Sequence, residues 1–168
     1  MKMLFNISLL IIIFGFTPND PKTFHSNNNR INLEADDTWS EKANMKGVEV
    51  YLFKKNVKNN SIVSIVISKD EGLLPLTSLE KYSASKIFLQ TSVLGTTPNS
   101  AVLKEVNGVS MKMYEYDYSD KELKQKHSIV YHAIVGNDGY QIVVTGHPDI
   151  FQLNRPAYNQ IINSIKIN

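Results

Sequence analysis

The sequence predicts an α/β domain of the α+β type, in which helices flank a mainly antiparallel β-sheet. Three observations favour this class. Asn107-Gly108 is the dipeptide most typical of a two-residue hairpin turn. Residues 61–68 are rich in β-branched side chains, as in a strand that is covered on both faces. Near the end of the chain, apolar residues recur at the spacing of one helix face, namely Tyr158, Ile161, Ile162 and Ile165.

The first third of the chain predicts strands. Ile31 and Leu33 alternate with polar residues and indicate a short first strand. Residues 48–53 indicate a second strand with one apolar face, and the polar, turn-prone residues 54–60 predict a hairpin loop after it. Residues 61–68 then follow as a central strand.

A helix is predicted next, beginning at Thr77 and ending near Leu94. Thr77 and Glu80 have the spacing of a capping box, and Gly95 suits a left-handed C-terminal cap. An irregular set of side chains is expected to face the sheet: Leu79, Tyr82, Ile87, Phe88 and Leu94.

Two hairpins and a closing helix complete the predicted order. The first hairpin pairs residues 101–106 with 109–118 around Asn107-Gly108, and the second pairs 128–135 with 140–145 around residues 136–139. The last helix is expected to begin at about Arg155-Pro156. This order places helices against a mainly antiparallel sheet.

The chain is expected to form one domain behind a leader, because 168 residues fit a single core. Lys2 precedes an apolar run over residues 4–16 that is too short to span a membrane, which predicts a cleaved signal peptide over residues 1–18. An uncleaved anchor is the alternative. Residues 19–29 are interpreted as a flexible lead-in and residues 30–168 as the domain.

The absence of cysteine excludes two covalent modifications of the exported chain. Without cysteine, the chain offers no site for a lipobox lipid and forms no disulfide. The mature protein is therefore expected to be soluble, periplasmic or extracellular, and not a lipoprotein. Its composition is ordinary, and 18 basic against 16 acidic residues argue against nucleic acid as a partner.

No catalytic, cofactor or metal site is expected, and the chain is interpreted as not an enzyme. The sequence contains no cysteine nucleophile, G-x-S-x-G elbow, glycine-rich phosphate loop or H-E-x-x-H motif. His127 and His132 lie five residues apart on one predicted strand, so they are expected on opposite faces and unable to share a metal. Asp36-Asp37 and His147-Pro148-Asp149 could hold a weak cation, but solvated carboxylates are the preferred interpretation.

Short matches in a fixed order resemble the PsbP family, named for the extrinsic subunit of photosystem II. They include Trp39 after the first strand, Leu94-Gly95 closing the helix, Tyr114 and Tyr116 in the hairpin, and His127 opening the next strand. Further matches are Gly47-Val48-Glu49-Val50, residues 60–68, Gly108, Gly139-Tyr140-Gln141-Ile142 and residues 161–165. The resemblance covers about residues 30–168. It implies an α/β/α sandwich that works by binding other proteins.

The chain also departs from the family pattern. Ala35-Asp36-Asp37-Thr38 stands before Trp39 where the family usually has a proline, and Phe151 stands in a region where it usually has a second tryptophan. The basic tail and photosystem-docking features of the plant subunit have no counterpart here. A photosynthetic role is therefore not carried over.

Three function classes remain open at the sequence level. The first is a non-enzymatic exported binding or assembly protein, whose partner is expected to be another protein of the cell envelope. The second is a small-ligand-binding α+β domain of the cystatin-like type, and the third is an immunity or inhibitor protein. The sequence does not choose the partner or the oligomeric state.

A partner-binding face is predicted on the strand over residues 109–118. Alternation places Val109, Met111 and Met113 on one face and a second set on the other: Lys112, Tyr114, Tyr116 and Tyr118. Tyrosines beside a lysine are typical of protein interfaces. The alternative is that a helix covers the tyrosines, of which Tyr118 is expected to be the most exposed.

Overall fold

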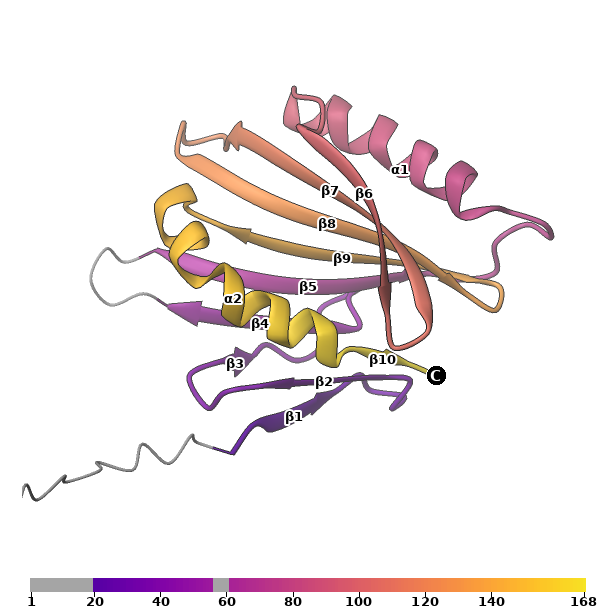
Figure 1. Cartoon of the computed structure of the whole chain (residues 1–168), viewed down its shortest axis with the longest axis horizontal. Helices are drawn as coiled ribbons and strands as arrows, with labels where there is room; N and C mark the ends of the chain where they lie inside the picture. Colours follow the sequence, from indigo (N-terminus) through magenta and orange to yellow (C-terminus); the bar gives the residue numbers. More distant parts are fainter. Residues whose placement is uncertain (1–19, 56–60) are drawn as a thin grey trace, which may run out of the picture.

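The computed structural model describes residues 20–55 and 61–168 (Figure 1). The predicted signal peptide and most of the predicted loop over residues 54–60 lie outside these ranges. In the described ranges, ten strands and two helices follow in the order β1 (Lys22–His25), β2 (Ile31–Ala35), β3 (Ser40–Glu41), β4 (Val50–Lys55), β5 (Ile62–Asp70), α1 (Leu79–Leu94), β6 (Ser100–Val106), β7 (Val109–Ser119), β8 (Gln125–Val135), β9 (Asp138–Gly146), α2 (Pro148–Ser164) and β10 (Lys166–Ile167).

The strands form two antiparallel sheets. The large sheet has the order β3-β4-β5-β9-β8-β7-β6, and the small one has the order β1-β2-β10. This confirms the predicted α+β class with a mainly antiparallel sheet. It also places β5 inside the large sheet, between β4 and β9.

The two helices lie on opposite faces of the large sheet. Phe151 of α2 packs on His127 of β8, with ring centroids 4.6 Å apart. Tyr82 of α1 packs on His132 of the same strand, with centroids 5.9 Å apart. Since five residues separate the two histidines, they project to opposite sides of β8, as predicted. In Figure 1, α2 crosses the front of the large sheet and α1 runs along β7.

The main hydrophobic core lies on the α2 side. The apolar sides of β4, β5, β8 and β9 meet α2 and the small sheet there, and Trp39 lies edge-on to Tyr158 of α2. Val63, Ile65 and Ile67 of β5 are buried in this core, whereas the opposite side of β5 is only half-buried. The predicted cover on both faces of this strand is therefore complete on one face only.

Near the two ends of the domain, a predicted boundary was wrong. The predicted flexible lead-in contains β1, which pairs with β2 and buries Phe24 to 2% exposure. Its pattern is short and polar, so its order depends on the pairing with β2 and on the burial of Phe24. The last helix begins at Pro148 rather than near Arg155, because Pro148 fits the first turn of a helix. Pro156 lies inside α2 on its exposed side.

The two hairpin turns position the strands that form the candidate site. Asn107 and Gly108 have φ angles of 48° and 79°, so both adopt the left-handed conformation that a type I′ turn needs. This confirms the first hairpin. The second connection is tighter than predicted, because β8 ends at Val135 as predicted but β9 begins at Asp138 rather than at Tyr140.

The N-terminal cap of α1 is Ser78, not the predicted Thr77. The Ser78 hydroxyl accepts a hydrogen bond from the Lys81 amide at 3.2 Å. Thr77 instead donates to the carbonyl of Leu74 at 2.7 Å. At the other end, Gly95 has a φ of 69° and donates to the Thr91 carbonyl, which confirms the predicted C-terminal cap.

Candidate binding surface beside α1

Polar contacts hold much of α1 on the sheet. Tyr82 donates to the Asp70 carboxylate at 2.6 Å, and Lys86 pairs with the same carboxylate at 2.7 Å. Glu80 pairs with Lys112 of β7 at 2.6 Å. Farther along the helix, Gln90 donates to Gln141 of β9 and accepts from Tyr116 of β7. The helix is thus attached by its polar groups at several points.

Few side chains of α1 are fully buried. Tyr82 and Ser83 are buried, whereas Phe88, Leu89 and Val93 are 72%, 57% and 82% exposed. The predicted sheet-facing stripe was therefore wrong at Phe88, which points away from the sheet. Leu89 and Val93 are four residues apart and share one side of the helix.

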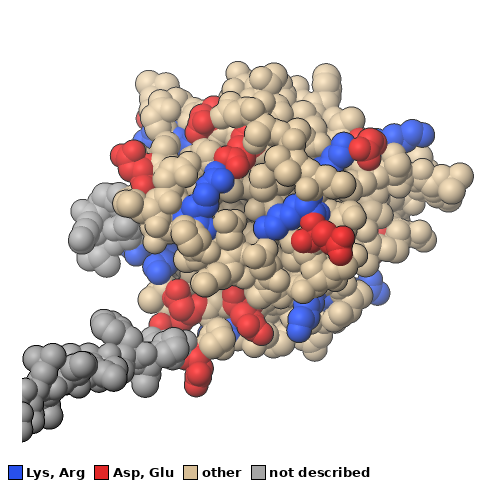
Figure 2. Space-filling view, in the orientation of Figure 1, with Lys and Arg blue, Asp and Glu red and all other residues tan. Residues whose placement is uncertain are grey.

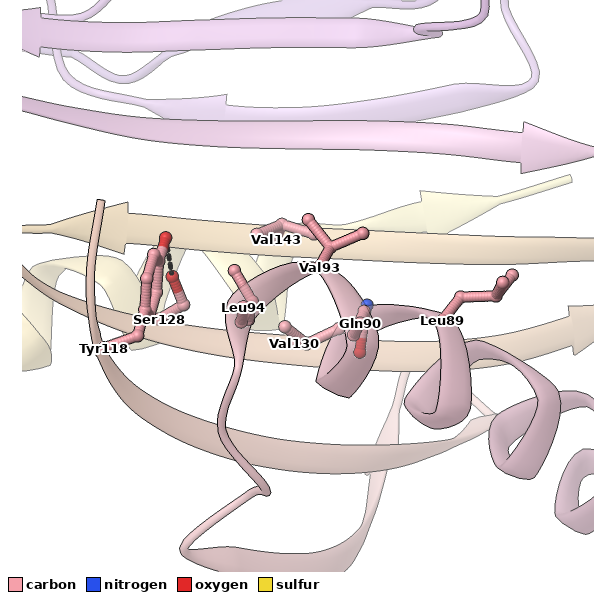
Figure 3. Close-up of a pocket in the computed structure, with 8 residues that line it drawn as sticks. All are labelled: Leu89, Gln90, Val93, Leu94, Tyr118, Ser128, Val130 and Val143. Carbon is pink, nitrogen blue, oxygen red and sulfur yellow. Dashed lines mark hydrogen bonds between the residues drawn. The ribbon is translucent and has the colours of Figure 1, made fainter. Parts of the chain in front are cut away.

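A groove of about 270 Å³ lies between the second half of α1 and the sheet (Figure 3). Leu89, Val93 and Leu94 line it from the helix, while Val130 and Val143 line it from β8 and β9. Its lining is completed by Gln90, Tyr118 and Ser128. The groove is consequently aliphatic, with a few polar groups at its borders.

One end of the groove carries a chain of hydroxyls. The Tyr118 hydroxyl lies 3.3 Å from that of Ser128, which lies 2.7 Å from that of Thr145. Figure 3 shows Tyr118 and Ser128 side by side at this end, with Val93 and Leu94 of the helix between them and Leu89. The polar end of a ligand in the groove could therefore form hydrogen bonds with hydroxyls at this end.

The structure separates the four residues predicted to bind a partner. Tyr114 and Tyr116 are 5% and 0% exposed and pack under α1 with Val130, so the alternative of a covering helix is correct for both. Lys112 is engaged with Glu80. Tyr118, which was expected to be exposed, is only half-buried and lies at the groove.

Sequence reasoning missed the helix residues that border the groove. Leu89 and Val93 did not belong to the predicted buried stripe, and their exposure could not be read from it. The available signal was an excess of apolar residues in α1 over those that one helix face can hold.

His132 lies at the centre of the α1–sheet contact. It is fully buried between Tyr82 of α1 and Tyr114 of β7, and neither ring nitrogen has a hydrogen-bond partner. Burial, and then the nearby Lys86 ammonium, lower the pKa of His132 from 6.5 to about 4, although Asp70 opposes the shift. The imidazole is therefore neutral at pH 7.

The Asp70 carboxyl experiences opposing influences. Desolvation alone would raise its pKa, but hydrogen bonds from Lys86 and Tyr82 outweigh desolvation and hold the pKa below its usual value. For Tyr82, desolvation and the bond to Asp70 raise the pKa of the phenol far above its usual value. The pair therefore consists of an anionic carboxylate and a neutral phenol at pH 7.

The opposite face of the sheet carries a separate cluster of polar and charged side chains beneath α2. His127 Nδ1 lies 2.7 Å from Asp117 and its Nε2 lies 3.4 Å from Glu115, which accepts from Arg155 at 2.6 Å. This cluster fastens α2 to β7 and β8. Across residues 20–55 and 61–168, no three His, Cys, Asp or Glu side chains are placed to hold a metal ion.

The surface on the α2 side has a mixed charge. Figure 2 shows basic and acidic side chains interspersed on this face rather than gathered into a field of one sign. Such a surface offers no focused attraction for a polyanion. Among the helices of the described ranges, none is long and apolar enough to cross a membrane.

No protein-family model matches the chain, and no curated protein matches it in sequence. Solved structures do match it. Cyanobacterial PsbP (CyanoP) from Synechocystis superposes with a TM-score of 0.60 at 11% identity, over 92% of this chain and 96% of that one. LpqN from Mycobacterium tuberculosis, described as involved in cell envelope biogenesis, gives 0.58 at 13% identity, over 88% and 90%.

A Bacteroides thetaiotaomicron protein gives a TM-score of 0.60 at 12% identity. The match covers 88% of this chain but only 48% of that one, so this chain spans about half the length of the Bacteroides protein. Identities this low establish the fold and nothing more. The chain has a PsbP-like fold, as the resemblance in its sequence implied.

Proposed function

We propose that this chain is a non-enzymatic, exported binding or assembly protein that holds its partner on the α1 surface. The α1 surface consists of Phe88, Leu89 and Val93 together with the groove that Tyr118 closes. The observation that carries the proposal is the exposure of these three large apolar side chains beside an aliphatic groove. Contiguous apolar patches of this kind mark interaction sites on soluble proteins.

The arrangement suits a protein partner. Leu89 and Val93 form a ridge beside the groove, and Tyr118 adds apolar area with a hydroxyl that can stay hydrogen-bonded. Phe88 precedes Leu89 in the sequence and adds exposed apolar area to the same part of the helix. An apolar side chain from a partner could enter the groove while its neighbours cover the ridge, which is the usual anatomy of an interface core.

The fold and the N-terminal sequence support the rest of the proposal. The solved structures that this fold resembles include a protein involved in cell envelope biogenesis and a PsbP protein. Lys2 and the apolar run over residues 4–16 have the pattern of a signal peptide. The chain also lacks the sequence motifs of the common catalytic sites.

Capture of envelope proteins by the tagged mature chain tests the binding surface. Leu89→Ser with Val93→Ser should remove a captured protein from the eluate while changing the melting temperature little, because both side chains are exposed. The matched control is Leu153→Ser, which alters a leucine of α2 that is 78% exposed. Equal capture by the unmodified chain, the double variant and the Leu153→Ser control would contradict the proposed surface.

Mass spectrometry of the protein from its native cells tests export. A new N-terminus between Gly15 and Pro21 is expected, because the cut should follow the apolar run and precede β1. Recovery of the full-length chain in washed membranes would support the anchor instead.

A small apolar ligand is the second candidate, and the observation in its favour is the groove itself. Aliphatic walls with hydroxyls at one end would suit a short hydrocarbon chain with a polar end. The fluorescent probe 8-anilinonaphthalene-1-sulfonate should then bind the folded protein, and Val143→Phe should block it by filling the groove. Lack of binding by the unmodified protein would remove this candidate.

A further inference from the structure

The contact between α1 and the sheet contains a histidine whose protonation would be unfavourable. His132 projects from β8 into this contact and is 0% exposed, and both of its ring nitrogens are without a hydrogen-bond partner. Protonation would place two N–H donors and a positive charge in a site that offers them no acceptor. A buried unpaired charge is among the most costly features that a folded protein can contain.

The charged and titratable groups around His132 give it little compensation. From α1, Tyr82 presents its ring and Lys86 contributes a positive charge. From β7, Tyr114 presents its ring, and Lys112 stands directly opposite His132 in the strand register. Among the described residues, Asp70 of β5 is the carboxylate that favours protonation of His132, but it already accepts from Tyr82 and pairs with Lys86.

The helix that covers His132 is the less firmly packed of the two. Only Tyr82 and Ser83 of α1 are buried, whereas α2 buries Phe151, Tyr158, Ile161 and Ile162 in the main core. Elements with few buried apolar contacts open at lower free energy than the core. Opening of α1 would expose a protonated His132 to water. This local opening therefore requires less free energy than unfolding of the whole domain.

We propose that α1 is an acid-released cover, which detaches from the sheet when His132 takes up a proton. This detachment exposes the apolar cluster formed by Tyr114, Tyr116 and Val130. The core between α2 and the sheet stays intact. The two tyrosines that the closed structure buries are accessible in the open form alone. The groove beside α1 loses one wall in the same step.

The direction and size of the pH effect on opening follow from the pKa values of His132 in the closed and open states. Its pKa is about 4 in the closed state and 6.5 when exposed, so the open state binds the proton more tightly and gains population as the pH falls. Between pH 7 and pH 5 the open state should gain on the order of 20-fold relative to the closed state. Asp70 remains ionised over this range, because its pKa lies below 3.8.

Amide hydrogen exchange followed by mass spectrometry tests this release on the mature chain alone. Rates are corrected for the intrinsic pH dependence of exchange, and α2 serves as the internal reference. Protection of α1 should fall on the order of 20-fold from pH 7 to pH 5, while protection of α2 and the fluorescence of Trp39 stay unchanged. Unchanged protection of α1, or equal losses in α1 and α2, would overturn the proposal.

Two variants assign the effect to His132. His132→Phe keeps an aromatic ring between Tyr82 and Tyr114 but cannot be protonated, so its α1 should show no loss of protection. His132→Leu provides a second neutral side chain if the phenylalanine is poorly accommodated. His147→Asn is the matched control, because this half-exposed histidine lies beside Asp149 outside the α1 contact. Retention of the pH response in both His132 variants would refute the role of this residue.

Discussion

At the scale of single residues, the turn at Asn107-Gly108 connects local chemistry with the rest of the fold. Both residues have positive φ, and the Asn107 side-chain amide donates to the carbonyls of Asn163 and Ile165. The turn therefore sets the register of β6 and β7 and also ties their tip to the end of α2. The dipeptide predicts the turn, but nothing local in the sequence predicts the contact with α2.

Gly108→Val should destabilise the protein by more than about 1 kcal/mol. Apart from Gly108 and its two chain neighbours, no heavy atom of the described residues lies within 4 Å of the position that a Cβ would take, so the expected loss arises from the φ of 79° and not from a clash. Urea unfolding followed by Trp39 fluorescence measures it. Gly108→Asn is the control, because asparagine tolerates this conformation and should lose much less. An unchanged free energy of unfolding for Gly108→Val would show that the turn does not need glycine.

The tyrosines of β7 mark a limit of sequence reasoning at this scale. Alternation correctly separates Met111 from Tyr114 and Tyr116, because the period of a strand is two. The period cannot tell which face meets a helix and which meets a partner. Burial of Tyr114 and Tyr116 depends on where α1 lies, and that position is set by contacts far away in the sequence.

At the scale of elements, α1 shows where local signals compete. Thr77 and Glu80 have capping-box spacing, yet Ser78 caps the helix and Thr77 bonds to Leu74 in the preceding turn. Two adjacent hydroxyl residues offer the same chemistry, so the backbone conformation of the loop decides between them. The C-terminal end of α1 was predictable because glycine alone there readily adopts the left-handed conformation.

Ser78→Ala should destabilise the protein by about 1 kcal/mol, the usual cost of losing an N-terminal cap. Thr77→Ala serves as the matched control and should cost less, because the Thr77 hydroxyl is bonded to a loop carbonyl and not to a free amide of the helix. Helix content and thermal unfolding by circular dichroism compare the two. A larger loss in Thr77→Ala would return the cap to the residue that the sequence pattern favours.

At the scale of the whole molecule, the two faces of the large sheet differ in their cover. The α2 side is closed by a helix and by the small sheet, and it holds the main core. On the other side, α1 contacts β7 and β8 and leaves the groove at its edge. The predicted sandwich is therefore correct in its layers but uneven in its packing, and the candidate binding surface lies on the less tightly packed side.

The small sheet accounts for the part of the fold that sequence reasoning missed. β2 pairs with β1 before it and with β10 from the other end of the chain. Neither β1 nor β10 has a strong pattern of its own, since one spans Lys22–His25 and the other Lys166–Ile167. Short strands of this kind form because a long-range partner is available, and a local pattern cannot show that partner.

Phe24→Ala tests whether β1 belongs to the folded domain. Phe24 is 2% exposed in the main core, so its truncation should cost about 3–5 kcal/mol, the range for a buried phenylalanine. Thr23→Ala is the matched control, since Thr23 is the exposed neighbour on the same strand and should change stability by less than about 0.5 kcal/mol. Urea unfolding measures both on the mature protein. Equal stability of the two variants would mean that β1 is only loosely attached and that the domain begins near residue 30, as its polar sequence first suggests. A large loss in Phe24→Ala alone would place the start of the domain at β1, and would require any cleavage of the leader to occur before Lys22.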